Sequence, residues 1–165
     1  KELSADQRLQ EKVLEARYQE FKDLIAQLEG MIALGVKALW LDMNAIFREI
    51  AEEDSTIRRL RGRVLPRDVG IQVGERVKKA LEQKRTREES DILNVLRPLA
   101  HDLRVNERPY ERVVTNSTFL VPARRKPEFD NRVTQLAAQY EGRIQFRYVG
   151  PLPPSDFVVR TAART

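Results

Sequence analysis

The chain has 165 residues, 41% of them hydrophobic, so it is long and apolar enough to bury a core without disulfides or a structural metal. It has no cysteine and one histidine, His101, which excludes disulfides, thiolate metal sites, cysteine nucleophiles and metal sites built on two histidines. The net charge of +5 favours acidic partners, although basic and acidic residues are interspersed over most of the sequence, as on an ordinary solvated surface. No apolar run approaches the roughly 20 residues that cross a bilayer, and a cysteine-free chain is typical of a reducing compartment. We therefore expect a cytoplasmic protein with no membrane partner.

Residues 1–30 are predicted to form one long helix that links to, or packs on, the rest of the protein. Apolar residues recur along it at spacings of four and three, which places them on one stripe: Leu14, Tyr18, Phe21, Ile25 and Leu28. Gly30 follows the stripe and is typical of a helix end. The stripe is only two heptads long, so packing on the chain's own domain is favoured over a coiled coil. The first half of the helix is poorer in apolar residues, so it either projects from the domain or packs on a partner.

A buried strand and two further helices are predicted next. Residues 31–41 form a short apolar run bounded by a glycine and an aspartate, which indicates a buried strand. Apolar residues at helical spacing predict a helix over 43–53 and a long one over 70–103. Pro98 is expected to kink or end the second of these helices.

A basic segment without aromatic residues lies between these two helices. Four of its arginines are candidates for an electrostatic dock that attracts an acidic protein surface: Arg58, Arg59, Arg61 and Arg63. Stacking on nucleic-acid bases is not supported, because no aromatic residue is interleaved with them. The alternative interpretation is a solvated segment that holds one structural ion pair.

The C-terminal third predicts a strand, a helix and a strand, over 112–121, 126–141 and 143–149. Apolar and polar residues alternate in the last strand, so one of its faces is buried and the other is wet. The whole order is α-β-α-α-β-α-β, which indicates an α+β fold with long helices and a small three-stranded sheet, mixed or antiparallel. If the strand over 31–41 inserts antiparallel between the other two, the sheet is a ferredoxin-like split βαβ. Residues 160–165 are expected to form a flexible tail.

The segment that follows the last strand, Gly150–Val158, holds three prolines within four residues. Proline lacks the N–H that a central strand needs and favours a stiff extended path, so we predict a rigid strap. The strap either closes the edge of the sheet or presents a preorganised surface to a partner. The candidate structural or protein-binding residues are Tyr148, Gly150, Pro151, Pro153, Pro154 and Phe157, with the two aromatic side chains bordering the core.

The sequence offers no constellation of catalytic residues. It has no glycine-rich phosphate loop, and no serine stands in the context of a nucleophile elbow that could use His101. Adjacent carboxylates such as Glu88 and Glu89 diverge on a helix, whereas general acid–base catalysis needs convergent groups. We therefore predict no catalytic residue, no cofactor and no metal site, and we do not expect an enzyme.

Three stretches of the sequence carry a resemblance to a known family. They are the helix-to-strand stretch from Arg17 to Trp40, the strand Asn116–Val121 and the terminal run Tyr148–Val158. In this order they resemble the GvpL/GvpF family of gas vesicle proteins, whose members end in a Gly-Pro-x-x-Pro-Tyr-Ser-Phe-Val-like segment. The chain has Gly-Pro-Leu-Pro-Pro-Ser-Asp-Phe-Val there, so Ser155-Asp156 replaces the usual Tyr-Ser.

The resemblance implies that residues 31–159 form the C-terminal α+β domain of such a protein, joined by the helix over 1–30 to a preceding ferredoxin-like domain. It implies a non-enzymatic accessory protein of gas vesicle assembly in the cytoplasm. Its expected partners are the hydrophobic shell protein GvpA and other gas vesicle accessory proteins, with no nucleic acid. The alternative, suggested by the pI of about 9.7, is a basic nucleic-acid-binding or regulatory protein.

Overall fold

The computed structural model describes residues 4–155 and residue 157. Residues 1–3 of the predicted first helix and the predicted tail over 160–165 lie outside these residues. The elements follow one another as α1 (Ala5–Leu28), β1 (Met31–Trp40), α2 (Met43–Glu53), α3 (Ser55–Leu60), α4 (Arg67–Leu96), a 3-10 turn (Arg97–Leu99), β2 (Asp102–Val105), β3 (Val113–Pro122), a second 3-10 turn (Ala123–Arg125), α5 (Lys126–Gln139) and β4 (Ile144–Leu152).

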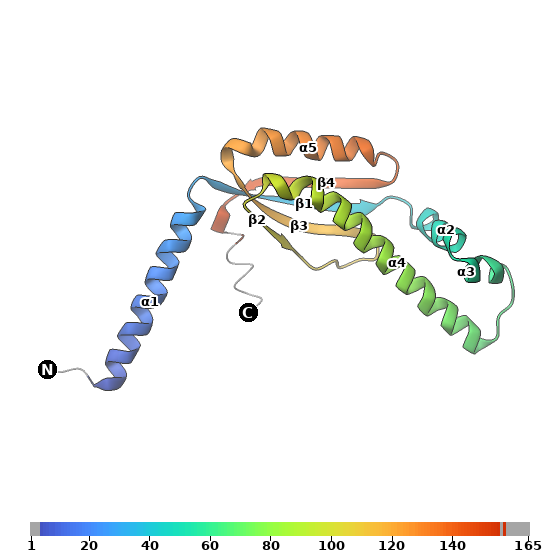
Figure 1. Ribbon diagram of the computed structural model, residues 1–165, viewed down its shortest axis with the longest axis horizontal. Helices are drawn as coiled ribbons and strands as arrows, with labels where there is room; N and C mark the ends of the chain where they lie inside the picture. The colour runs from blue at the N-terminus through green and yellow to red at the C-terminus, as the bar shows by residue number, and fades with distance from the viewer. Residues whose placement is uncertain (1–3, 156, 158–165) are drawn as a thin grey trace.

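The strands form one antiparallel sheet in the order β2-β3-β1-β4 (Figure 1). β1 lies between β3 and β4 and runs antiparallel to both, so the predicted insertion of this strand is confirmed. The predicted count of three strands is wrong, because β2 adds a fourth strand beside β3. The sequence placed β2 at the end of a helix. In the structure the α-helix ends at Leu96, and the 3-10 turn around Pro98 separates it from β2, whose four residues are too few to show an alternating pattern.

α4 and α5 pack against one face of the sheet and enclose the main core. That face carries Leu34 and Val36 of β1 and Phe119 of β3, all of them buried. They belong to one apolar cluster with Ile92 of α4 and Phe129 of α5. Alternate residues of β1 therefore point into this core, as expected for a half-buried strand.

The opposite face of the sheet has no helical layer in the described residues, and its buried positions lie toward the two ends: Leu39 and Val113 are buried at one end, and a second apolar cluster lies at the other. There Phe157 packs with Ala33 and Leu120, and Leu28 from the end of α1 borders them. Among the residues that the structure describes, the long helices α4 and α5 lie on the other side. We call the uncovered remainder the open face.

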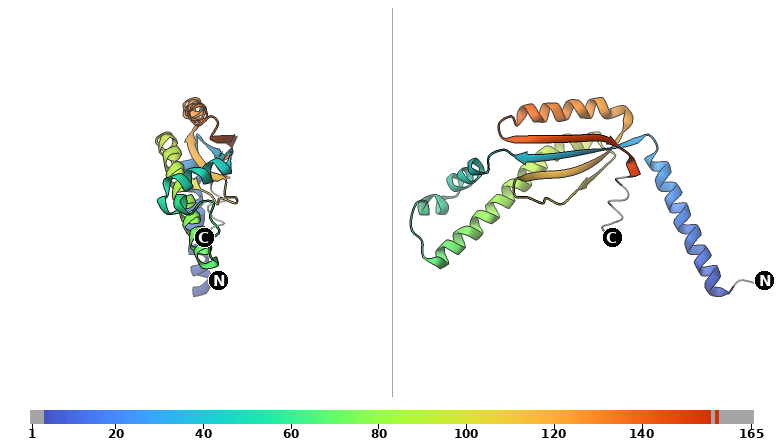
Figure 2. Two further views of the ribbon diagram at one scale, coloured as in Figure 1. Left: turned by 90° about the vertical axis from the view of Figure 1, so that its right-hand side faces the viewer. Right: turned by 180° about the vertical axis from the view of Figure 1, so that it is seen from behind.

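α1 projects away from the sheet, and the views of Figures 1 and 2 agree that no other helix or strand runs alongside it. It begins in a capping box, in which the Ser4 hydroxyl accepts from the backbone N–H of Gln7 and the Gln7 side chain accepts from the backbone N–H of Ser4. It ends before Gly30, whose φ of +77° turns the chain into β1. The helix is thus well delimited at both ends although none of its residues is buried.

The short helix α3 was not predicted. Asp54 caps it by accepting from the backbone N–H groups of Thr56 and Ile57, at 2.9 and 3.1 Å. Ile57 is the buried residue of this helix and joins the main core. One apolar anchor gives no helical period, which is why the sequence showed only a basic segment here.

A network of charged side chains holds α2, α4 and the start of β4 together. Arg143 donates to Glu88 at 2.7 and 3.0 Å and to Glu49. Lys84 lies 3.0 Å from a carboxylate oxygen of Glu49, and the indole N–H of Trp40 donates to Glu88 at 3.3 Å. Burying a charge costs free energy unless the charge is paired and hydrogen-bonded. Here each partly buried charge has an oppositely charged partner that also hydrogen-bonds to it. We call these five residues the Arg143 network.

The proline-rich segment takes a different path from the predicted one. β4 continues through Gly150 and Pro151 to Leu152, and helical residues follow from Pro154. β4 tolerates the proline because it is an edge strand and pairs only with β1. The segment is thus the end of an edge strand followed by a helical turn. We keep the name strap for residues 150–155 and 157; positions 156 and 158 of the predicted strap lie outside the described residues.

Candidate partner-binding site on the first helix

The apolar stripe of α1 is exposed over most of its length. Leu14, Tyr18, Phe21 and Ile25 are each between 52% and 67% exposed, although such side chains are usually buried. Of the predicted stripe, only Leu28 contacts the apolar cluster beneath the sheet. The expected packing of the stripe on the chain's own domain is therefore wrong within the described residues, except at its last turn.

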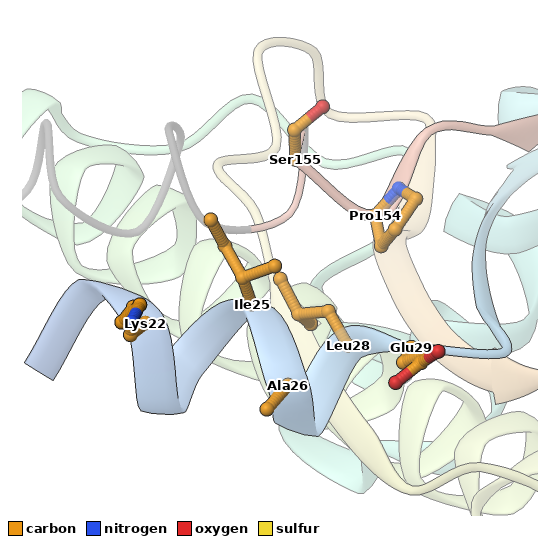
Figure 3. Close-up of a pocket in the computed structure, with 7 residues that line it drawn as sticks. All are labelled: Lys22, Ile25, Ala26, Leu28, Glu29, Pro154 and Ser155. Carbon is orange, nitrogen blue, oxygen red and sulfur yellow. The ribbon is translucent and has the colours of Figure 1, made fainter. Parts of the chain in front are cut away.

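An apolar groove lies where α1 meets the strap (Figure 3). It has a volume of about 690 Å³ and is open to solvent. Its apolar part comes from Ile25, Ala26 and Leu28 on the helix and from Pro154 on the strap, and its polar part from Lys22, Glu29 and Ser155. Ile25 belongs both to this groove and to the exposed stripe, so the two form one continuous surface.

Phe157 fixes the strap to the sheet. Its side chain is only 8% exposed and packs on Ala33 and Leu120. The backbone carbonyl of Phe157 accepts from the guanidinium of Arg104, whose centre also lies 5.0 Å from the Phe157 ring. Phe157 therefore borders the core, as predicted, and is not free to contact a partner.

Tyr148 and Gly150 also serve the fold. The Tyr148 hydroxyl donates to Asp130 at 2.6 Å, and burial together with this carboxylate raises the pKa of the phenol above its ordinary value. A side chain at Gly150 would meet Leu34 and the backbone of Ala33 at 2.7 and 3.1 Å, so the close approach of the two strands requires glycine. Both residues act within the domain.

The three prolines differ in position. Pro151 lies in β4 and Pro153 follows that strand, and both are exposed. Pro154 is half-buried and lines the groove beside α1. Of the six candidate strap residues, the structure thus brings only Pro154 to the exposed apolar surface. That the strap contacts a partner stays a prediction.

The candidate basic dock lies far from α1. Arg58 and Arg59 are on α3 and Arg61 and Arg63 follow it, at the opposite end of the molecule from α1 in Figure 1. All four are exposed, and within the described part of the chain no ion pair engages them. The structure therefore does not unite the two sets of candidate residues in one site, and the dock stays a prediction.

The candidate residues for metal binding or catalysis stay apart in the described part of the chain. His101 is exposed, and its backbone N–H donates to the carbonyl of Leu120 at 2.7 Å. Across residues 4–155 and 157, no group of three or more His, Asp and Glu side chains is placed to hold a metal ion. No helix in those ranges is both long enough and apolar enough to cross a bilayer.

The chain is similar to proteins named gas vesicle protein F. It is 21% identical to the protein from Microcystis aeruginosa (strain PCC 7806) and 23% identical to that from Dolichospermum flosaquae, in each case over 142 residues. Both alignments cover 84% of this chain and 58% of the relative. The chain thus spans a little more than half the length of these relatives.

Solved structures share the fold. The crystal structure of the gas vesicle protein GvpF from Anabaena sp. PCC7120 superposes with a TM-score of 0.76 over 87% of this chain and 60% of that one, at 21% identity. The structure of GvpF from Microcystis aeruginosa gives a TM-score of 0.72 over 87% and 61%, at 20% identity. The family model described as gas vesicle synthesis protein GvpL/GvpF matches residues 3–159. Because this match takes in nearly the whole sequence, the chain belongs to the GvpL/GvpF family.

Proposed function

We propose that the chain is a non-enzymatic accessory protein of gas vesicle assembly, which binds the hydrophobic shell protein GvpA or other accessory proteins through the apolar stripe of α1. Membership of the GvpL/GvpF family supports the role in vesicle formation. The observation that carries the binding mode is the exposure of Leu14, Tyr18, Phe21 and Ile25 on a helix with no buried residue. We place the protein in the cytoplasm, at the growing gas vesicle.

The physical argument starts from the partner. A small subunit that polymerises into a shell carries a large apolar surface, and such a surface aggregates unless it is covered before assembly. A helix that presents apolar residues at spacings of four and three is suited to lie along an apolar groove or beside another helix. Burying an aromatic or aliphatic side chain contributes about 1.5–3 kcal/mol before the cost of association is subtracted. Full burial of four such residues would contribute about 6–12 kcal/mol in all, and binding follows where this exceeds the cost of association.

The proposal can be tested by co-purification with tagged GvpA. We expect GvpA to retain the chain, and Phe21→Asp to abolish retention because a carboxylate replaces an apolar contact. The matched control is Ile71→Asp on α4, which changes an equally exposed isoleucine (56%) outside the stripe and is expected to leave retention intact. Equal retention of Phe21→Asp and the parent chain would contradict the proposed binding mode. If GvpA fails to associate even with a chain extended to the full length of the relatives, the proposed partner is wrong.

Nucleic-acid binding remains the second candidate, favoured by the exposed arginines from Arg58 to Arg63. It predicts binding of an oligonucleotide that weakens steeply with salt, because phosphate contacts release counterions. A titration of the chain with a single-stranded oligonucleotide at low salt tests this. We expect no saturable binding, since the arginines lack interleaved aromatic residues for stacking.

A further inference from the structure

A row of like charges crosses the open face. In the register of the sheet, Lys37 of β1 lies directly opposite Arg147 of β4 on one side and Asn116 of β3 on the other. Residues opposite one another share a face of the sheet, with Cβ atoms about 4.5–5.5 Å apart. Two cations thus stand side by side in the middle of the sheet, and we call this the Lys37 row.

No acidic residue of the three long strands accompanies these cations on that face. The neighbouring positions on β1 and β4 are Gly35 and Val149 on one side of the row, and Leu39 and Gln145 on the other. Within the described part of the chain, neither Lys37 nor Arg147 takes part in an ion pair. By contrast, Glu49, Glu88 and Asp130 are paired with cations on the helical side.

This arrangement is unfavourable in the isolated domain. Like charges placed directly opposite one another on a sheet are destabilising, and an acidic residue at either position would remove the repulsion. The row lies four residues along β1 from Ala33, a distance of about 13 Å, so it stands beyond the sheet end that Phe157 covers. Val149 adds an apolar contact beside it, because it is 55% exposed and leans over Gly35, where no side chain intervenes.

We propose that the open face binds an acidic amphipathic helix of a partner protein. Carboxylates on successive turns of such a helix, three or four positions apart, would reach Lys37 and Arg147, and an apolar residue between them would cover Val149. Charge-assisted hydrogen bonds to the two cations relieve their mutual repulsion on binding. The helix also supplies the missing layer on the second face of the sheet. This surface is separate from the stripe of α1, so the two proposals stand or fall independently.

The geometry favours a protein helix over a polyanion or a membrane. The row holds two cations, and Lys37 is half-buried beside Gly35 and Leu39, whereas phosphate backbones and anionic bilayers are bound by extended basic surfaces. The long strands present no aromatic residue on the open face for a base to stack on. Two adjacent cations bordered by an apolar side chain are complementary to one face of a helix that carries carboxylates and an apolar residue between them.

The test uses a capped 16-residue helical peptide with glutamates at spacings of four and leucines at the adjoining positions, labelled for fluorescence anisotropy. We expect saturable binding to the full chain, and a loss of at least about tenfold in affinity for the double variant Lys37→Glu/Arg147→Glu, because each lost charge-assisted contact accounts for roughly that factor. The matched control is Lys78→Glu/Lys79→Glu on exposed positions of α4, which changes the net charge equally and should alter affinity by less than about twofold.

The single variant Arg147→Glu separates a binding role from a folding defect. It places a glutamate opposite Lys37, so we expect the melting temperature to stay the same or rise by up to about 3 °C while peptide affinity falls. The proposal is overturned if no saturable binding occurs below about 1 mM peptide, if the control variant loses as much affinity as the double variant, or if Arg147→Glu keeps full affinity. It is also overturned if a 20-nucleotide single strand or phosphatidylserine vesicles bind through the Lys37 row more tightly than the peptide does.

Discussion

The helical side of the sheet and the helix α1 use the same kinds of side chain in opposite ways. On the helical side, Phe129 is fully buried and the charges of Glu88 and Arg143 are paired. On α1, Phe21 and Tyr18 are exposed and no residue is buried. Apolar surface stabilises the fold only when the chain itself covers it. The apolar surface of α1 is not covered, so it can instead contribute to association with a partner. Substitutions should therefore separate stability from binding.

The largest expected loss of stability comes from Phe129→Ala. Phe129 is fully buried, and its ring lies 5.1 Å from that of Phe119 and 5.8 Å from that of Tyr148. Removing the ring leaves a cavity between α5 and the sheet, so we expect the free energy of unfolding to fall by about 3–5 kcal/mol. Urea denaturation followed by circular dichroism measures this. A loss below about 1 kcal/mol would mean that α5 does not close the core.

The second-largest loss of stability is expected when the Arg143 network is broken. Glu88→Ala leaves Arg143 and the indole N–H of Trp40 without their shared acceptor. Because Arg143 is about one-third exposed, we expect a loss of about 2–3 kcal/mol, below the roughly 3–5 kcal/mol of a fully buried pair. Glu75→Ala removes an exposed carboxylate from the same helix and serves as the control in parallel denaturation experiments. Equal losses for the two variants would show that the network does not stabilise the domain.

Acid should weaken the same network. Hydrogen bonds from Arg143, opposed in part by burial, lower the pKa of Glu49 from 4.5 to about 2. A pKa lowered in the folded state gives stability that is present above pH 4.5 and is lost as the pH falls toward 2. Thermal melts between pH 7 and pH 2 should therefore show a smaller decline for Glu49→Gln than for the parent chain. Parallel curves for the two proteins would contradict this contribution of Glu49.

The sequence predicted those parts of the fold that have a local period. The apolar run in β1 and the alternation from Ile144 to Tyr148 were sufficient to place two neighbouring strands of the sheet. The Arg143 network could not be predicted, because Glu49 and Arg143 lie 94 positions apart and meet only in the folded chain, where α2 packs against α4. β2 was missed because four residues after a helix carry no period of their own.

The candidate surface on α1 also shows what local sequence patterns can and cannot predict. The stripe from Leu14 to Leu28 was visible in the sequence, since helical spacing is a local property. Whether the stripe is covered depends on the path of the chain after Gly30, which turns β1 away from the helix (Figure 2). Periodicity thus identified the apolar side chains, and only the structure showed that they are exposed.

The smallest effect on stability is expected for Phe21→Ala, which makes on α1 the same substitution as Phe129→Ala makes on α5. Phe21 is 59% exposed, so its removal should change the free energy of unfolding by less than about 0.5 kcal/mol. Urea denaturation alongside Phe129→Ala measures the difference between the two sites, and retention on tagged GvpA should show the reverse ranking. A loss above about 2 kcal/mol for Phe21→Ala would mean that the stripe is already covered in solution, by the chain itself or by a second copy. In that case the melting midpoint of the parent chain would rise with protein concentration only if a second copy provides the cover.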